Sequence, residues 1–165
     1  MKEIRLTQGQ VALVDDGDYQ ELSKYRWYAA WNPHTHSYRA VRTDCTGDKP
    51  KTVYMARVIM QAHPGQKVDH RRHDTLNNQR ENLRLCTNAE NGYNRKSNVG
   101  SSSAFKGVVW HRRDRKWQAY IRLANHLHHL GYFADEIAAA RAYDVKAVEI
   151  FGDFALTNFD MIELQ

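Results

Sequence analysis

The stretch VDHRRHDTLNNQRENLRLCTNAEN, residues 68–91, is the most informative part of this sequence for predicting its fold. Asp69 and His70 stand where a short predicted β-run, residues 67–68, ends, and a loop dense in Asn, Asp and Arg follows them. A second short apolar run occupies 83–86, and the polar residues after it can cap a helix. We therefore expect a strand, a loop, a second strand and a helix in this order.

This predicted unit has the residue types of a metal-dependent hydrolytic site. Asp69 stands near one end and Asn91 at the other, and carboxylate and amide oxygens suit one hard divalent cation. His70, next to Asp69, can accept a proton from water.

Three short motifs in one order resemble the HNH, or His-Me finger, nuclease family. They are "DH", a loop ending in "NNxxENLR", and "TxAEN". The resemblance implies that His70 is the general base, and that Asp69 and Asn91 bind one Mg²⁺ (or Mn²⁺). It also implies that Asn82 fixes the loop by hydrogen-bonding its backbone. Within the family, the chain is similar to homing endonucleases of phage type.

Two departures from that pattern bear on activity. Relatives usually carry His where Ala56 stands, and an Asn-Gly turn where this chain has RRH at 71–73. Arg71 can bind a phosphate beside the cut. Either Arg71 or Arg80 can neutralise the charge that develops around phosphorus.

The composition favours a globular protein that binds polyanions. The 165 residues suit one or two small domains, and 42% are hydrophobic and 26% charged. A mean hydropathy of −0.74 indicates much polar surface. The formal net charge is +5 and the pI about 9.2, so double-stranded DNA is the first partner to expect. A merely basic surface explains the charge equally well.

Cysteine use and hydropathy point to a reducing compartment and to no membrane contact. Cys45 and Cys86 lie far apart, and the absence of a CxxC pair disfavours a structural zinc site. No apolar run approaches the ~20 residues that span a bilayer, and the first ten residues lack an apolar signal core. We expect a cytoplasmic, DNA-associated protein, which the resemblance places in a bacterial or phage-infected cell. Monomer and homodimer both remain open.

Residues 1–62 predict short strands and turns with two short helices. Together with the motif at 67–96 they form a first domain over 1–96. Three aromatic side chains there can stack on bases or fill a small β core, and the core is favoured. They are Trp27, Trp31 and Tyr38. For Arg39 and Arg42, phosphate contact and simple solvation are equally expected.

The stretch NRKSNVGSSSA, residues 94–104, is rich in Ser, Gly and Asn and predicts a flexible linker over 97–104. Arg95 and Lys96, just before it, can follow a DNA backbone. A plain tether is an equally good interpretation.

Residues 105–160 predict a second domain of three strands and one helix. The strands are expected at 105–110, 116–122 and 127–133. Asp135 can cap a helix that runs to about Phe151 and ends at Gly152. The fold class expected for the chain is α+β. A β-rich amino-terminal region leads into a ββα-metal motif, and a three-stranded antiparallel sheet then packs on one helix.

The middle strand of this domain alternates strictly between two faces. Trp117, Ala119 and Ile121 share the face that can pack on the alanine-rich helix. The other face is polar and basic, and a three-stranded sheet with such a face can enter a major groove.

The segment 105–159 resembles the ethylene-response-factor (Apetala-type) DNA-binding domain of plants, which is also found fused to HNH nucleases. The shared motifs are "KGV", "KWQAYIR", "HLGYF", "AARAYD" and "FGDFALTNF". The resemblance and the open face together mark a set of DNA-contacting residues. They are Lys106, His111, Arg113, Lys116, Gln118, Tyr120, Arg122 and His129. Val109 and Leu127 match contact positions as well, but ordinary packing is preferred for both.

The sequence thus favours a metal-dependent DNA endonuclease that hydrolyses phosphodiester bonds and is targeted by its C-terminal sheet. The alternative is a non-catalytic, sequence-specific DNA-binding protein derived from such a nuclease, which Ala56 and the altered loop at 71–73 support. A structural or RNA-binding protein is disfavoured, because two independent motifs point to DNA.

Overall fold

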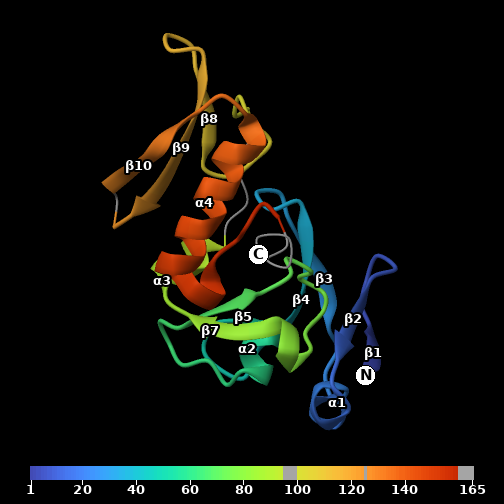
Figure 1. Cartoon of the computed structure of the whole chain (residues 1–165). Coiled ribbons are helices and arrows are strands. Elements are labelled where there is room, and N and C mark those ends of the chain that lie inside the picture. The colour runs from blue at the N-terminus through green and yellow to red at the C-terminus, as the bar shows by residue number, and fades with distance from the viewer. Residues whose placement is uncertain (95–99, 125, 160–165) are drawn as a thin grey trace. The chain divides into compact units, whose positions relative to one another are not determined.

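The computed structural model describes residues 1–94, 100–124 and 126–159, and the chain folds into two compact units, Met1–Thr87 and Asn88–Gln165. Each unit combines short antiparallel strands with helices (Figure 1). The predicted α+β fold class is confirmed. Within the described ranges, no helix is long and apolar enough to cross a membrane.

The first unit contains three small antiparallel sheets, with the strand orders β1-β2, β3-β4-β5 and β6-β7. Its elements in chain order are β1 (Lys2–Arg5), β2 (Val11–Val14), α1 (Asp16–Leu22), β3 (Tyr28–Asn32), β4 (Ser37–Asp44), β5 (Lys51–Tyr54), α2 (Met55–Ile59), β6 (Lys67–His70), the 3₁₀ turn η1 (Arg80–Asn82) and β7 (Leu83–Cys86). The β-rich lead-in and the strand–loop–strand motif are therefore both present.

One apolar cluster joins these small sheets. Val14 of β2 and Met55 of α2 have no exposed surface, and the cluster also contains Trp27 and Leu83. The Trp27 indole Nε1 donates to the carbonyl oxygen of Leu22 at 2.8 Å, which satisfies its single polar atom. Because Leu83 begins β7, the cluster anchors the β6–β7 hairpin to the rest of the unit.

The three aromatic residues considered above divide between core and surface. Trp27 is only 5% exposed, which confirms the core prediction for that residue. Trp31 is 49% exposed, so the core prediction is wrong for it, although its ring lies 4.9 Å from that of Tyr38. Trp31 and Tyr38 pair across the β3–β4 hairpin next to its turn, where solvent reaches the rings.

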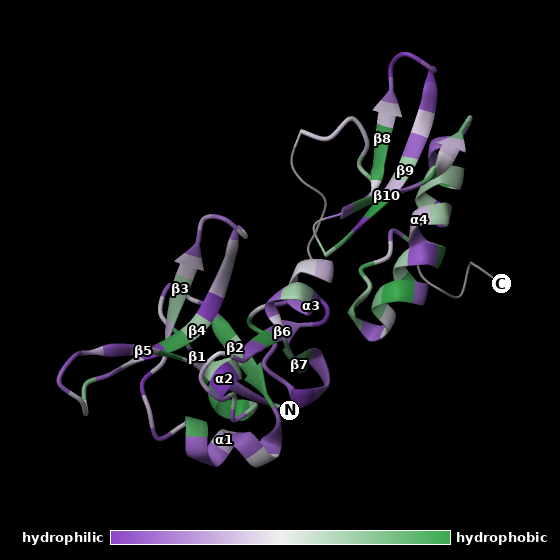
Figure 2. Cartoon of the chain, turned by 90° about the vertical axis from the view of Figure 1, so that its left-hand side faces the viewer, coloured by the Kyte–Doolittle hydropathy of each residue, from purple (hydrophilic) through white to green (hydrophobic). Residues whose placement is uncertain are grey.

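The second unit is built on one three-stranded antiparallel sheet with the order β8-β9-β10. Its elements are α3 (Asn88–Tyr93), β8 (Val108–His111), β9 (Lys116–Leu123), β10 (His126–Phe133), α4 (Glu136–Phe151) and the 3₁₀ turn η2 (Gly152–Phe154). The β8–β9 turn is hydrophilic throughout (Figure 2). Helix α4 packs against all three strands through two apolar clusters.

Helix α4 begins and ends where the sequence predicts. The Asp135 side chain accepts a hydrogen bond from the backbone N–H of Ala138 at 2.8 Å, and Gly152 follows the last helical residue with a φ of +51°. Ala139 and Ala147 are completely buried. Their small side chains allow the helix to lie close to the sheet.

Gly107, in the "KGV" motif, occupies a position that admits only glycine. Its φ is +75°, and a Cβ atom there would overlap the ring of Tyr143 and the carbonyl oxygen of Tyr120. The motif thus reflects the close approach of this backbone to α4 and β9.

Helix α3 belongs to the second unit, since the boundary falls between residues 87 and 88. The sequence instead assigns it to a first domain over 1–96. Tyr93, its last residue, stacks on Phe151 with ring centroids 3.9 Å apart and planes 11° apart. The ammonium group of Lys106 donates to the carbonyl oxygen of Tyr93. The stacking holds α3 to the end of α4, and the hydrogen bond holds it to the segment before β8.

Of the predicted linker 97–104, the structure describes residues 100–104. Ser103 Oγ donates to the Glu136 carboxylate at 2.7 Å, and Ser102 Oγ accepts from the backbone N–H of Trp110 at 2.8 Å. These two serines therefore make hydrogen bonds within the second unit.

Candidate functional site

The β6–β7 hairpin turns Asp69 and His70 to opposite faces. They are the last two residues of β6, and Asp69 pairs with Arg84 and His70 with Leu83 in the β7 register. Neighbouring side chains on a strand alternate between faces. The carboxylate is consequently buried, whereas the imidazole lines a pocket.

Asp69 forms a buried ion pair. Arg84 donates to Asp69 Oδ2 from Nε at 2.9 Å and from Nη2 at 2.6 Å. The two side chains are 10% and 7% exposed. At this depth the attraction has to offset the loss of hydration of both charges, so the partners depend on each other. The residue predicted to bind a metal ion thus shares its carboxylate with a guanidinium.

His70 is oriented by Asn78. His70 Nε2 lies 3.4 Å from Asn78 Oδ1, and Asn78 Nδ2 donates to the carbonyl oxygen of Leu76 at 3.0 Å. The amide oxygen can only accept, so Nε2 carries the proton and Nδ1 is the basic nitrogen. Burial lowers the pKa of His70 below its ordinary 6.5, the Asn78 bond acts against this, and the charge of Arg39 lowers the pKa further.

Asn82 holds the loop between the two strands. It is completely buried. Its Nδ2 donates to the carbonyl oxygens of Asp74 at 3.0 Å and Asn77 at 2.7 Å, and its Oδ1 accepts from the backbone N–H of Arg72 at 3.0 Å. Its own carbonyl oxygen accepts from the N–H of Arg71 at 2.8 Å. One side chain thus fixes three backbone groups of the loop.

The loop arginines differ in what they can do. Arg80 makes two hydrogen bonds to the Asp18 carboxylate, at 2.6 and 2.9 Å, and its backbone N–H donates to Asp15. Arg80 therefore ties the loop to α1. Arg71 is exposed at the start of the loop. Of the two arginines considered above for the phosphorus centre, the geometry favours Arg71.

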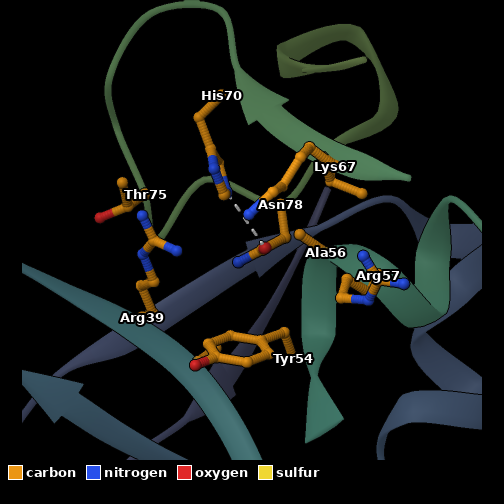
Figure 3. Close-up of a pocket in the computed structure, with 10 residues that line it drawn as sticks. Arg39, Tyr54, Ala56, Arg57, Lys67, His70, Thr75 and Asn78 are labelled. Carbon is orange, nitrogen blue, oxygen red and sulfur yellow. Dashed lines mark hydrogen bonds between the residues drawn. The ribbon is translucent and has the colours of Figure 1, made fainter. Parts of the chain in front are cut away.

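A pocket of about 260 Å³ lies beside His70 (Figure 3). It is lined by Arg39, Ala40, Tyr54, Ala56, Arg57, Lys67, Val68, His70, Thr75 and Asn78. Three of these side chains are cationic, and none of the described lining residues is acidic. Ala56 contributes only a methyl group to the wall. The arrangement suits an anion.

The metal-ligand prediction rests on few donors. Asn91 lies exposed on α3 in the second unit, so its pairing with Asp69 stays a prediction. In the described part of the chain, no three His, Cys, Asp or Glu residues are grouped to hold a metal ion. A carboxylate and an amide oxygen nevertheless fit Mg²⁺, which keeps several water ligands and needs only one or two carboxylates.

The second unit brings most of the predicted DNA-contacting residues to one face of its sheet. Cross-strand pairing puts His111 opposite Lys116, and Tyr120 opposite His129. This open face contains His111, Lys116, Gln118, Tyr120, Arg122 and His129. Tyr132, which the sequence analysis missed, joins them, with its ring 5.1 Å from His111 and 4.6 Å from His129. These residues form a polar, aromatic and basic surface.

The remaining predicted DNA contacts lie elsewhere. Arg113 stands in the β8–β9 turn with a side chain that is 91% exposed. Lys106 is half-buried, and burial lowers the pKa of its ammonium group to about 8. Its hydrogen bond to Tyr93 gives it a structural partner inside the unit. Arg95 and Lys96 lie outside the described residues.

Comparison with known proteins relates the chain to nucleases. A family model of HNH endonucleases matches residues 53–93. An uncharacterized HNH endonuclease of Acanthamoeba polyphaga mimivirus is 28% identical over 150 residues, which make up 91% of this chain and 75% of the viral protein.

A second group of relatives comes from plants. An AP2-like ethylene-responsive transcription factor of Arabidopsis thaliana is 44% identical over 62 residues, which are 36% of this chain and 12% of the plant protein. Another from the same plant is 27% identical over 162 residues, covering 87% of this chain and 29% of the plant protein. The chain therefore spans only a minor part of these transcription factors. A segment of the chain is similar to HNH endonucleases, and about a third of its length is similar to AP2-like ethylene-responsive transcription factors.

Proposed function

We propose that this chain is a metal-dependent DNA endonuclease of the homing type, in which His70 activates water for attack on a phosphodiester. The placement of His70 carries the proposal. Asn78 fixes its Nε2 and leaves Nδ1 as the proton acceptor, at a pocket lined by cations. A phosphodiester is the anionic substrate that such a pocket suits.

In the proposed reaction, Nδ1 of His70 accepts a proton from water as the water oxygen bonds to phosphorus. The bond between phosphorus and the 3′ oxygen breaks, and that oxygen takes a proton from solvent. The products are a 3′-hydroxyl and a 5′-phosphate. Asn82 keeps the loop in place during this step, and Arg71 reduces the charge around phosphorus. One such site cuts one strand, so a monomer nicks.

A divalent ion, Mg²⁺ or Mn²⁺, held by Asp69 and Asn91 would supply charge stabilisation at the leaving 3′ oxygen. Arg84 bears on this in two ways, because its two hydrogen bonds fix the orientation of the Asp69 carboxylate and also occupy Oδ2. A carboxylate that is held in one orientation is nonetheless a suitable oxygen ligand.

The second unit would deliver the nuclease to double-stranded DNA through the open face of its sheet. That face combines two cationic side chains with hydrogen-bonding and aromatic groups, the mixture that can read base edges as well as phosphates. The similarity to plant transcription factors supports this role.

A non-catalytic DNA-binding protein is the second candidate. The buried Asp69–Arg84 ion pair favours it, because a nuclease needs that carboxylate for its ion. Ala56 in the pocket wall points the same way.

Plasmid nicking separates the two functions. With Mg²⁺ or Mn²⁺, the full chain is expected to convert supercoiled plasmid to open circles, and removal of the metal with EDTA should stop the conversion. A His70→Ala preparation made in parallel controls for contaminating nucleases. A mobility shift of the plasmid fragments without nicking under either metal would establish the binding protein instead.

Arg122 tests the targeting surface. Arg122→Ala is expected to weaken binding to duplexes that the wild-type chain selects from a random library by about 1–3 kcal/mol, with a smaller loss on scrambled duplexes, if its guanidinium reads a base. Lys146→Ala, on α4, removes one positive charge from the layer behind the sheet and should change neither affinity. Equal losses on selected and scrambled duplexes would assign Arg122 to phosphate binding.

A further inference from the structure

Arg39 lines the same pocket as His70, although it lies outside the segment that matches the nuclease family. It comes from β4, the middle strand of its sheet. Figure 3 shows its guanidinium pointing toward Thr75, on the side of the pocket where His70 stands. Arg39 lies close enough to His70 for its positive charge to contribute to lowering the pKa of the imidazole.

The Arg39 guanidinium retains hydrogen-bonding capacity. Its Nε is buried and has no hydrogen-bond partner among the described residues. A buried donor of this kind is unfavourable unless a water or another bound molecule supplies the acceptor. The other arginine of the pocket is different, because Arg57 donates to the carbonyl oxygens of Ala62, His63 and Gln66.

Arg42, on the same strand, also has a buried Nε, but the surroundings of its guanidinium differ from those of Arg39. Its Nε is also buried without a hydrogen-bond partner among the described residues. However, its guanidinium lies over the Tyr25 ring at 4.3 Å and near that of Trp27 at 5.9 Å. Cation–π interactions with these two rings therefore stabilise its charge. Arg42 does not line the pocket.

The pocket has the size and charge for a phosphate group. Its 260 Å³ is several times the ~30 Å³ share of one water molecule in the liquid. Ala40 and Ala56 contribute only short side chains to its lining. A guanidinium presents two parallel N–H groups that match two oxygens of one phosphate.

We propose that Arg39 binds a non-bridging oxygen of the same phosphodiester that the water activated by His70 attacks. It thereby holds the phosphate in the pocket and stabilises the added negative charge as the water oxygen bonds to phosphorus. The proposal rests on the proposed function, because it places this phosphate at the cleavage site.

Nicking by Arg39 variants tests this role. Arg39→Met is expected to lower the rate of plasmid nicking by about 10²–10³-fold, the usual effect of losing one donor to a developing oxyanion. Arg39→Lys should recover part of the activity, since Lys keeps the charge but lacks the two parallel N–H groups of the guanidinium. The matched control is Arg42→Met, which removes the same charge from the same strand and should retain activity close to that of the wild type. Circular dichroism melts identify any variant that fails to fold.

Titration with inorganic phosphate in metal-free buffer provides a readout that does not depend on cleavage. In the full chain labelled with nitrogen-15, the backbone amide signals of Val68 and Thr75 and the Nε–H signal of Arg39 are expected to shift saturably. The shifts of Val68 and Thr75 should disappear in Arg39→Met and persist in Arg42→Met.

The two experiments separate failure of this inference from failure of the nuclease function. Wild-type nicking that survives Arg39→Met undiminished overturns the role of Arg39 and leaves the nuclease intact. A wild-type chain that never nicks overturns the nuclease function. In that case, phosphate shifts that require Arg39 still support the anion pocket, and shifts that are absent or independent of Arg39 overturn it.

Discussion

Replacing His70 by Ala is expected to lower metal-dependent plasmid nicking by about 10²–10⁴-fold, the usual contribution of a positioned general base. DNA binding should be largely unchanged, because one half-buried imidazole contributes little to a salt-dependent phosphate interface. The reason for the large catalytic effect is geometric. Asn78 holds the ring so that Nδ1 is the basic nitrogen, and Ala offers no acceptor in its place.

The pH dependence of the wild-type rate follows from the same site. His70 must be neutral to accept a proton, and burial lowers its pKa below 6.5. Nicking should therefore persist as the pH falls to 6.5 and decline only below that, as the imidazole becomes protonated. The measurement is the single-turnover nicking rate from pH 5 to 8 at fixed metal concentration.

The control for this experiment is His63→Ala. His63 is an exposed histidine of the first unit that does not line the pocket. It should retain the rate and the pH profile of the wild type. Unchanged nicking by His70→Ala would remove the general base from the proposed mechanism, and an acid limb above pH 6.5 would show that some other group controls the reaction.

Local patterns in the sequence were sufficient to predict much of the fold. Strict alternation along 116–122 predicted which side of β9 packs on α4, and Ala119 and Ile121 are indeed buried. The start and end of α4 follow from Asp135 and Gly152, because capping chemistry depends on a few neighbouring residues. Such features need no information about distant parts of the chain.

Tyr132 shows that a β-bulge changes which face of a strand a residue occupies, which simple alternation along the sequence does not predict. Counting from His129 in steps of two would turn Tyr132 toward the helix. The register shifts between His129 and Gly131, so two residues of β10 oppose one of β9 and the alternation is reset. Tyr132 consequently pairs with Gln118 on the open face. The sequence signals the bulge only through a glycine.

The pocket depends on contacts that sequence patterns do not encode. Asn78 is held by Leu13, whose carbonyl oxygen accepts from its N–H at 2.8 Å, and the two are 65 positions apart. Arg39 and His70 likewise come from separate hairpins. The Asp69–Arg84 pair is cross-strand, so it becomes foreseeable only once the β6–β7 register is known. These contacts depend on the tertiary structure, so residue types along the sequence could not predict them.

Asn82→Ala is expected to lower the free energy of unfolding of the first unit by about 3–5 kcal/mol, because a buried polar group that loses its partner costs about 1–3 kcal/mol. Three backbone groups are affected, the carbonyls of Asp74 and Asn77 and the N–H of Arg72. The mutation also leaves a cavity at a completely buried position. Nicking should fall with stability, since the loop follows directly on His70.

Hydrogen exchange resolved by peptide in the full chain measures this effect where it occurs. Segment 67–86 should exchange much faster in Asn82→Ala, while segment 116–133 of the second unit serves as an internal reference and should not change. Asn77→Ala is the matched control, because its side chain makes one hydrogen bond, to the N–H of Gln79 at 3.1 Å. That loss is expected to cost about 1 kcal/mol. If the two variants opened the hairpin equally, the three bonds of Asn82 would not be what holds the loop, and the position of His70 would need another explanation.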